Sequence, residues 1–420
     1  MRYSSFSLPV WMMMSRGGWS KWSSDMYRAK KIAFGEFVEK MLVTRECDLR
    51  INEFNLFDYD CGLDELNVCS WVIAALDRRV ECICVSIPLT IQMNLPECMF
   101  SSNLRSLKLY APRGANFGLP SSLCAAGKIK NLELDKVLFP DGDGSGQLVL
   151  ECPVLESLKI MHCDLSNLKV LTLATPLLEN LLFGNLFTNT NTSCEVRIST
   201  PNLKSIEFDI FSWSKDEFVV DYFMDNLSTL QSAYIHYGDH SSYATKRYSE
   251  CLIKILHGVC NAQSLELSVS SMKILTADPV LVQRIPDIFH SLTHVTLGVP
   301  FQAPLDGVLS ILVKFRHLET LTLFWEKYKL VPSEKEAENL SFEGLFNHLK
   351  AIKIKGLSDG RSELKLLEIL LKMAIVLEDV SVTAKKDLSS KHDFLDFGVK
   401  LRALPRASLN ATVHIIQKQQ

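Results

Sequence analysis

The fold is decided by a short stretch, LESLKI at 155–160, in which apolar residues stand at the first, fourth and sixth positions. The same spacing recurs as LRSLKL at 104–109, LETLTL at 318–323 and LKAIKI at 349–354. Alternation at the fourth and sixth positions places two side chains on one face of a short strand. One such strand cannot bury its apolar face alone, so we expect stacked copies to share a core.

The copies of this triplet start mostly 23 to 32 residues apart, which is a leucine-rich-repeat periodicity. One interval is split by an extra triplet, LKVLTL at 168–173. An ordinary α/β domain with LxxLxL strands is the alternative, but a dozen copies favour a solenoid. We predict an α/β leucine-rich-repeat solenoid, with one curved parallel sheet and a helical or irregular convex side. The other copies are VECICV at 80, IKNLEL at 129, LLENLLF around 178, LKSIEF at 203, LQSAYI at 230, AQSLEL at 262, LTHVTL at 292 and LEDVSV at 377.

Two features of the core follow from this pattern. A helix is predicted over 362–378, where apolar residues recur at spacings of three and four, and LEDVSV should add a strand behind it. This segment would cover a terminal sheet edge. The helical stripe consists of Leu364, Leu367, Leu371 and Ala374.

The repeat pattern also predicts the core. The fourth position of each repeat should be buried, namely Leu107, Leu132, Leu158, Ile206, Leu265, Leu321 and Ile352.

Composition limits the classes of protein and partner. The 420 residues are 47% hydrophobic and 22% charged, which is enough apolar surface for an extensive core. The formal net charge of -3 offers no general attraction for nucleic acid or anionic lipid, so neither a nucleic-acid nor a membrane partner is expected. The 12 cysteines include no CxxC pair and are predicted to be reduced, mostly buried thiols of a cytoplasmic or nuclear protein.

The common catalytic motifs are missing from the sequence. It contains no G-x-x-x-x-G-K-[ST], H-E-x-x-H or G-x-S-x-G, so we expect no enzyme, no catalytic residue and no cofactor. His290 and His294 have a metal-pair spacing only on a helix, and His294 falls in a predicted strand. Cys82 and Cys84 lack a second ligand pair. The loop DGDGSG at 141–146 lacks the distal glutamate of a calcium loop, so no metal site is expected and an acidic, flexible rim loop is predicted.

The concave face of the predicted sheet is where binding residues should gather, because positions 3, 5 and 7 of every repeat project there. The fifth positions alternate in charge and do not form a basic stripe for nucleic acid. Exposed aromatic residues with mixed polar neighbours favour a protein interface, although sideways packing of these rings between repeats is an equal alternative. The candidate partner-binding residues are Tyr110, Tyr234, His236, Phe324 and Trp325.

Two longer stretches resemble plant F-box proteins in which the F-box is followed by leucine-rich repeats and a C-terminal FBD domain. Residues 152–183, beginning CPVLESLKI, are similar to the "CP-x-LE-x-L" repeat of that family. Residues 345–382, beginning LFNHLKAIKIKG, are similar to its FBD signature. The segments at 34–42 and 71–87 are similar to its lead-in, and the resemblance extends from about residue 30 to 415.

The resemblance implies three parts: a poorly ordered segment at 1–30 with the F-box missing or vestigial, a solenoid with its lead-in at 31–340, and an FBD-like cap at 341–420. It implies a non-enzymatic protein-recognition module like the substrate-binding part of an F-box ubiquitin-ligase receptor. The alternative is an F-box-less binding or decoy protein that recruits no ligase. A cullin-type ubiquitin ligase is an expected partner only if an F-box is present, and the protein target is not identified by the sequence.

Overall fold

The computed structural model contains two compact units. Unit 1 comprises residues 1–203 and 216–226, and unit 2 comprises 204–215 and 227–420. No helix within the described ranges is long and apolar enough to cross a membrane. The structure describes residues 32–33, 35–40, 52–57, 65–89, 92–100, 102–112, 115–188, 194–211, 220–225, 227–238, 246–287, 289–300, 305–325, 346–357, 361–384 and 398–416.

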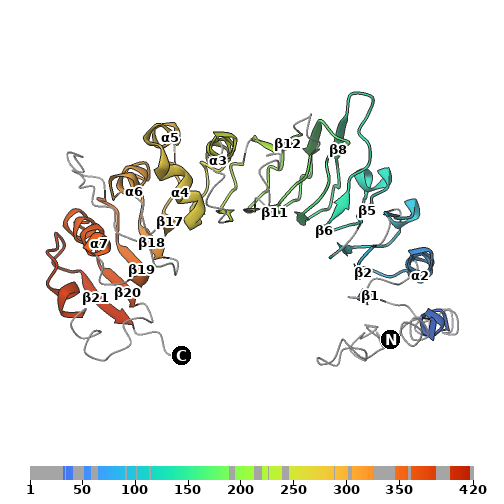
Figure 1. Ribbon diagram of the computed structural model, residues 1–420, viewed down its shortest axis with the longest axis horizontal. Coiled ribbons are helices and arrows are strands. Elements are labelled where there is room, and N and C mark those ends of the chain that lie inside the picture. The colour runs from blue at the N-terminus through green and yellow to red at the C-terminus, as the bar shows by residue number, and fades with distance from the viewer. Residues whose placement is uncertain are drawn as a thin grey trace, which may run out of the picture. The chain divides into compact units, whose positions relative to one another are not determined.

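The main sheet of unit 1 is parallel throughout, with the strand order β1-β2-β4-β6-β9-β11 (Figure 1). The repeats stay in register, so that Leu107 pairs with Leu132 and Leu132 with Leu158. The strands are β1 (Glu53–Phe57), β2 (Cys82–Ser86), β4 (Ser106–Tyr110), β6 (Asn131–Asp135), β9 (Ser157–Met161) and β11 (Asn180–Gly184).

The back of unit 1 is covered mainly by further strands. A second parallel sheet has the order β14-β12-β10-β8, and a third has the order β3-β5-β7. The helices on this side are α2 (Glu65–Asp77) and the short 3-10 turns η2 (Glu97–Met99) and η3 (Ser121–Ala125). The strands are β3 (Met93–Asn94), β5 (Phe117–Gly118), β7 (Val137–Leu138), β8 (Gln147–Leu150), β10 (Val170–Leu173), β12 (Glu195–Ile198) and β14 (Asp221–Met224).

This arrangement corrects the prediction that every triplet lies in one sheet. The extra triplet LKVLTL forms β10, which pairs with β8 and β12 in the second sheet. These back strands alternate buried and less buried side chains, as in Leu171 and Leu173 against Thr172, which is the period of a strand. The pairing of β10 and β12 ends at Leu173 and Ile198, and Pro176 and Pro201, which cannot donate to a ladder, stand three residues beyond.

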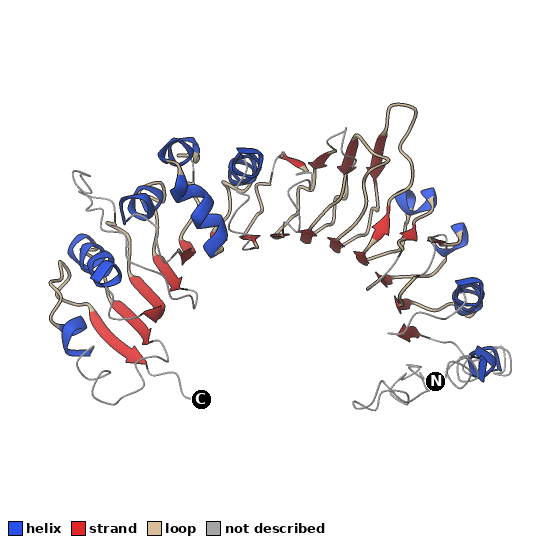
Figure 2. Cartoon of the chain, in the orientation of Figure 1, coloured by secondary structure: helices blue, strands red, loops and turns tan. Residues whose placement is uncertain are grey.

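Unit 2 carries a parallel sheet backed by helices, which lie on one side of its strands (Figure 2). Its strand order is β13-β15-β16-β17-β18-β19-β20-β21. The strands are β13 (Ser205–Ile210), β15 (Ser232–Tyr237), β16 (Ser264–Leu267), β17 (His294–Val299), β18 (Thr320–Trp325), β19 (Ala351–Leu357), β20 (Asp379–Ala384) and β21 (Thr412–Ile416). The helices are α3 (Lys246–Gly258), α4 (Val269–Ala277), α5 (Pro279–Arg284), α6 (Leu305–Leu312) and α7 (Arg361–Met373).

The predicted core is confirmed in both units. Each of the seven fourth-position residues named above is at most 1% exposed. The predicted C-terminal helix is α7, in which Leu367 and Leu371 are buried and Leu364 is half-buried. Leu366 and Leu370 are also buried, so the apolar stripe is wider than predicted. LEDVSV forms β20 as expected, and β21 extends the sheet by one strand that the sequence pattern did not predict.

Candidate functional site

The front face of each main sheet bears positions 3, 5 and 7 of the repeats and points away from the buried fourth and sixth positions. Of the five predicted binding residues, Tyr110 lies on the front face of unit 1. Tyr234, His236 and Phe324 lie on the front face of unit 2, where His236 and Tyr234 share β15 and Phe324 is on β18. Trp325 follows Phe324 and therefore projects to the other side of β18, where it is half-buried.

Two carboxylates of β6, Glu133 and Asp135, have direct partners on the front face of unit 1. The ammonium Nζ of Lys108 is 2.5 Å from Oε1 of Glu133, and the Tyr110 hydroxyl donates a hydrogen bond to Glu133. Burial tends to raise the pKa of Glu133, but the hydrogen bonds from Lys108 and Tyr110 outweigh it and lower the pKa below its ordinary value. Burial, together with the hydrogen bond to Glu133, raises the pKa of Tyr110. Tyr110 is therefore held by its neighbour on β6.

A second pair completes this network in unit 1. Nδ1 of His162, just after β9, is 2.9 Å from Oδ1 of Asp135 at the end of β6. His162 has a φ of 49°, a left-handed backbone conformation that is uncommon for a residue with a side chain. Lys159, at position 5 of β9, adds an electrostatic attraction to Glu133. Both front-face carboxylates of β6 therefore have a direct partner, whereas Lys159 makes no hydrogen bond or salt bridge among the described residues.

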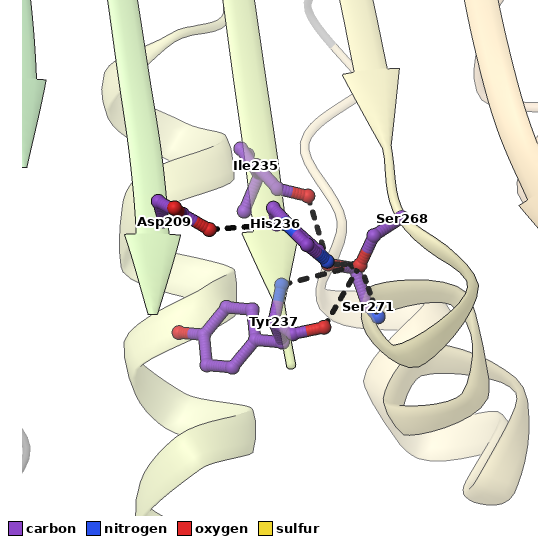
Figure 3. Close-up of polar contacts among 6 residues, drawn as sticks. All are labelled: Asp209, Ile235, His236, Tyr237, Ser268 and Ser271. Atoms are coloured by element: carbon purple, nitrogen blue, oxygen red, sulfur yellow. Dashed lines mark hydrogen bonds and ion pairs between the residues drawn. The ribbon is translucent and has the colours of Figure 1, made fainter. Parts of the chain in front are cut away.

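On unit 2, an imidazole is surrounded by one acid and two rings. Nδ1 of His236 is 3.0 Å from Oδ1 of Asp209 on β13 (Figure 3). The His236 ring lies edge-on to Phe211 at 5.1 Å and to Tyr234 at 5.9 Å between centroids. These spacings fall in the range of favourable aromatic contacts. His236, predicted from sequence, therefore belongs to a cluster with Asp209 and Phe211, which the sequence did not single out.

The backbone on both sides of His236 is fixed by the start of α4. The Ser268 hydroxyl accepts from the backbone N–H of Tyr237 and donates to its carbonyl, each at 3.2 Å (Figure 3). The Ser271 hydroxyl donates to the carbonyl of Ile235 at 2.9 Å. Ser268 also caps α4 by accepting from the backbone N–H of Ser271. One serine therefore joins the strand that presents His236 to the helix behind it.

The turn from β16 into α4 sets a steric requirement on the neighbouring strand. A Cβ on Gly298 of β17 would lie 2.4 Å from the backbone nitrogen of Val269. Real Cβ atoms do not approach a backbone atom so closely, so only glycine fits here. Position 7 of β17 is consequently occupied by the chain at Ser268 and Val269 instead of by a side chain of its own.

Glu266, in the middle of unit 2, is less satisfied than the two carboxylates of β6 in unit 1. Glu266 lies on β16 in register with Tyr234 and Thr296 and makes no hydrogen bond or salt bridge among the described residues. Burial raises its pKa above the ordinary value, while the charges of Lys355 and His236 act in the opposite direction. A half-buried carboxylate without a direct partner is costly, and it is the kind of group that an incoming cation would stabilise.

The side chains considered from sequence as possible metal ligands do not come together in the structure. Among the described residues, no group of three or more histidine, cysteine or acidic side chains is placed to hold a metal ion. Cys82 and Cys84 are free thiols, and burial raises the pKa of Cys84 to about 11, which disfavours the thiolate that binds metals. Oδ1 of Asp143, in the predicted acidic loop, instead accepts from the backbone and hydroxyl of Ser145 and from the backbone N–H of Gln147.

The prediction that the cysteines are mostly buried is wrong for the described residues. Ten cysteines lie within the described ranges, and none of these forms a disulfide there. Only four of them are fully buried, Cys152, Cys163, Cys194 and Cys251. Cys98 is exposed and the others are half-buried, so thiols are more accessible than predicted.

Comparison with known proteins gives relatives but no matching family model. A putative F-box protein of Arabidopsis thaliana is 25% identical over 303 residues, which cover 69% of this chain and 57% of that protein. An F-box/LRR-repeat protein of the same plant is 27% identical over 309 residues, covering 69% of this chain and 56% of that protein. A putative FBD-associated F-box protein is 25% identical over 399 residues, covering 91% of this chain and 88% of that protein.

The matches to the first two relatives span somewhat more than half the length of those proteins. The parallel repeat sheets of both units are consistent with the LRR-repeat description of the second. The longest match also includes the region where the FBD-like sequence was recognised. Over most of its length, the chain is a distant homologue, at about 25% identity, of Arabidopsis thaliana F-box/FBD/LRR-repeat proteins.

Proposed function

We propose that the chain is a non-enzymatic protein-recognition module that acts as the substrate-binding part of an F-box type ubiquitin-ligase receptor. The observation that carries this proposal is the front face of unit 2, where aromatic and charged side chains stand in register along parallel strands. The homology to F-box/LRR-repeat proteins supports the same role. In this role, the chain binds a protein target, and other subunits carry out any ubiquitin transfer.

The chemistry of the face suits a protein partner. Tyr234 and Phe324 offer apolar ring surface, and His236 with Asp209 offers hydrogen-bonding groups beside it. Aromatic residues within a polar surround are enriched at protein interfaces. The two hydrogen bonds between the Ser268 hydroxyl and the Tyr237 backbone hold the strand that presents His236. Less conformational freedom is therefore lost when a partner binds.

Recruitment of a cullin-type ligase depends on an F-box in the same polypeptide. Residues 1–30, where the sequence shows only a fragment of one, lie outside the described residues. Binding of the cullin adaptor therefore separates the two interpretations made from sequence. A receptor binds both adaptor and target, whereas a decoy binds the target alone. The FBD-like segment enters the proposal as a cap, because β19, α7, β20 and β21 continue the repeat order of unit 2.

Site-specific photo-crosslinking in plant cells tests the recognition role. A photoreactive phenylalanine analogue is placed in the full chain at Tyr234 or Phe324, and at Lys254 on the exposed side of α3 as a control. We expect the two front-face positions to crosslink to the same protein and the control position not to. Addition of Tyr234→Ala to the Phe324 probe should reduce that crosslink. Equal crosslinking from all three positions would refute recognition by this face.

A further inference from the structure

The front-face carboxylates Glu133 and Asp135 of unit 1 differ from Glu266 of unit 2 in whether they have a direct partner. On unit 1, Lys108 is paired with Glu133 and Asp135 with His162. A partner that approached these groups would first have to break existing pairs. On unit 2, Glu266 on β16 and Lys353 on β19 make no hydrogen bond or salt bridge among the described residues. Charges that remain unpaired in the free protein are the ones available to a partner.

The two unpaired charges lie at opposite sides of a small uncharged floor. Glu266 is in register with Thr296, Thr296 with Thr322, and Thr322 with Lys353, so the four residues form one row across β16 to β19. Phe324 lies two residues beyond Thr322 on the same face. The row therefore has a negative end, a threonine centre next to an aromatic ring, and a positive end.

Neighbouring groups strengthen each end. Glu266 adjoins the strand that carries Tyr234 and His236, and beyond it β13 carries Glu207 and Asp209 on the same face. Asp209 is itself paired with His236, and the Tyr234 ring, in register with Glu266, offers a surface on which a cation can rest. At the other end, Lys355 is two residues from Lys353 on the same strand, and both lysines are exposed; the charge of Lys355 also acts on Glu266.

We propose that unit 2 binds an extended protein segment that crosses its strands, with a basic side chain at Glu266 and an acidic side chain at Lys353 and Lys355. This inference rests on the proposed recognition function and specifies the partner's chemistry. Three strand spacings of about 4.8 Å separate β16 from β19, roughly 14 Å. An extended chain advances about 3.3 Å per residue, so the basic and acidic residues should stand about four positions apart.

The residues between the two charges are also constrained. The two threonines between the charges are uncharged; Thr322 is buried, and Thr296 and Phe324 are half-buried. An apolar side chain between the charges would gain contact with the Phe324 ring, and a further charge would lose solvation without gaining a partner. The expected segment therefore reads basic, two to four uncharged residues with at least one apolar, then acidic, in one of the two chain directions.

Selection from a library of random 12-residue peptides tests this motif. The full chain is immobilised as wild type, as Glu266→Lys, and as the triple charge reversal Glu266→Lys, Lys353→Glu, Lys355→Glu. The wild type should enrich peptides with a basic and an acidic residue three to five positions apart. The triple variant should enrich the same spacing with the two charges in reversed order. Glu250→Lys on α3 is the matched control, because it makes the same charge change on a helix behind the sheet.

Affinity measurements on one selected peptide complete the test. By fluorescence anisotropy, Glu266→Lys should weaken binding about tenfold or more, and replacing the peptide's basic residue by an acidic one should restore it. Thermal melts of each variant verify folding. The inference is overturned by enriched peptides without the charge pair, by enrichment unchanged in the triple variant, or by no enrichment at all. In those cases crosslinking from Tyr234 and Phe324 decides separately whether the recognition function stands.

Discussion

Units 1 and 2 solve the same structural problem in two ways. Each must cover the back of a parallel sheet, and unit 1 does so largely with strands while unit 2 uses helices. The main-sheet strands from β4 to β11 start 23 to 26 residues apart, and those of unit 2 start 26 to 33 apart. A strand rises about 3.3 Å per residue and a helix about 1.5 Å, so a helix needs more than twice as many residues for the same length.

The lengths of two back elements illustrate this relation. The four residues of β10 and the nine residues of α4 each span about 13 Å by these rises. A short return segment therefore favours a strand and a long one favours a helix, provided that the apolar period agrees. In α3 the buried residues Cys251, Leu252, Ile255 and Leu256 follow the helical period, whereas β10 alternates.

The largest effect is expected from truncation of the core in either unit. Leu158→Ala in unit 1 and Leu265→Ala in unit 2 each leave a cavity at a fully buried position and should cost about 2 to 5 kcal/mol. Because each repeat contacts mainly its neighbours, amide exchange should accelerate in β6, β9 and β11 for the first variant and in β15, β16 and β17 for the second. Exchange accelerated equally in both units by either variant would show that they unfold as one.

A smaller effect is expected at the junction of β16 and α4. Gly298→Ala forces a Cβ against the backbone of Val269 and should lower the free energy of unfolding by about 1 to 3 kcal/mol. Gly127→Ala in unit 1 is the matched control, since a Cβ there meets nothing within 4 Å, and it should change stability by less than about 0.5 kcal/mol. Urea denaturation measures both, and equal values would contradict the close approach seen at Gly298.

Loss of the Ser268 hydroxyl should have the next effect in size. Ser268→Ala removes the cap of α4 and the link to Tyr237, at a cost of about 0.5 to 2 kcal/mol. Ser268→Thr retains a hydroxyl and should lose less. If Ser268→Ala leaves both stability and peptide binding unchanged, the hydrogen bonds of Ser268 to Tyr237 do not position His236.

The smallest expected effect, and the most diagnostic one, is a difference between Glu133 and Glu266 in how stability depends on pH. Despite burial, hydrogen bonding lowers the pKa of Glu133, so its contribution to stability is present above its ordinary pKa of 4.5 and is lost as the pH falls through the lower folded value. Burial raises the pKa of Glu266, so its favourable contribution is present below 4.5 and is lost as the pH rises through the raised value.

The two glutamine variants should therefore differ in sign at pH 7. Glu133→Gln should destabilise and Glu266→Gln should stabilise, each by less than about 1 kcal/mol because both groups are partly solvated. Denaturant titrations at pH 4 and pH 7 measure the difference. Destabilisation by Glu266→Gln at pH 7 would mean that this carboxylate already has a partner within the chain, against its proposed role.

The repeat spacing predicted the main strands because burial at positions 4 and 6 is a local property of each copy. It failed for LKVLTL, which has the same apolar pattern as its neighbours but stands about half a repeat away from them. Pattern alone does not distinguish a front strand from a back strand when both bury two residues. The short intervals on either side of Leu168 were the signal that this copy occupies another layer.

The candidate site was less predictable for a different reason. Position in the repeat placed Tyr234 and His236 on one face, and this required no long-range information. The state of Glu266 depends on Lys355, which is supplied by a strand three repeats later in the sheet. Similarly, Tyr110 is held by Glu133 from the next repeat. Charge pairing across repeats depends on the length of the two side chains and on the register of their strands. The spacing of apolar residues within one triplet gives neither.

The second sheet of unit 1 has a consequence for how this sequence can change in length. An inserted residue between β9 and β10 would shift β10 against both β8 and β12, and a one-residue shift exchanges buried and exposed side chains. A residue inserted between α3 and β16 in unit 2, where the described residues 259–263 form no second ladder, can be absorbed in the loop. Insertions should therefore be tolerated behind the face that carries Glu266, which leaves that face free to diversify while its register is kept.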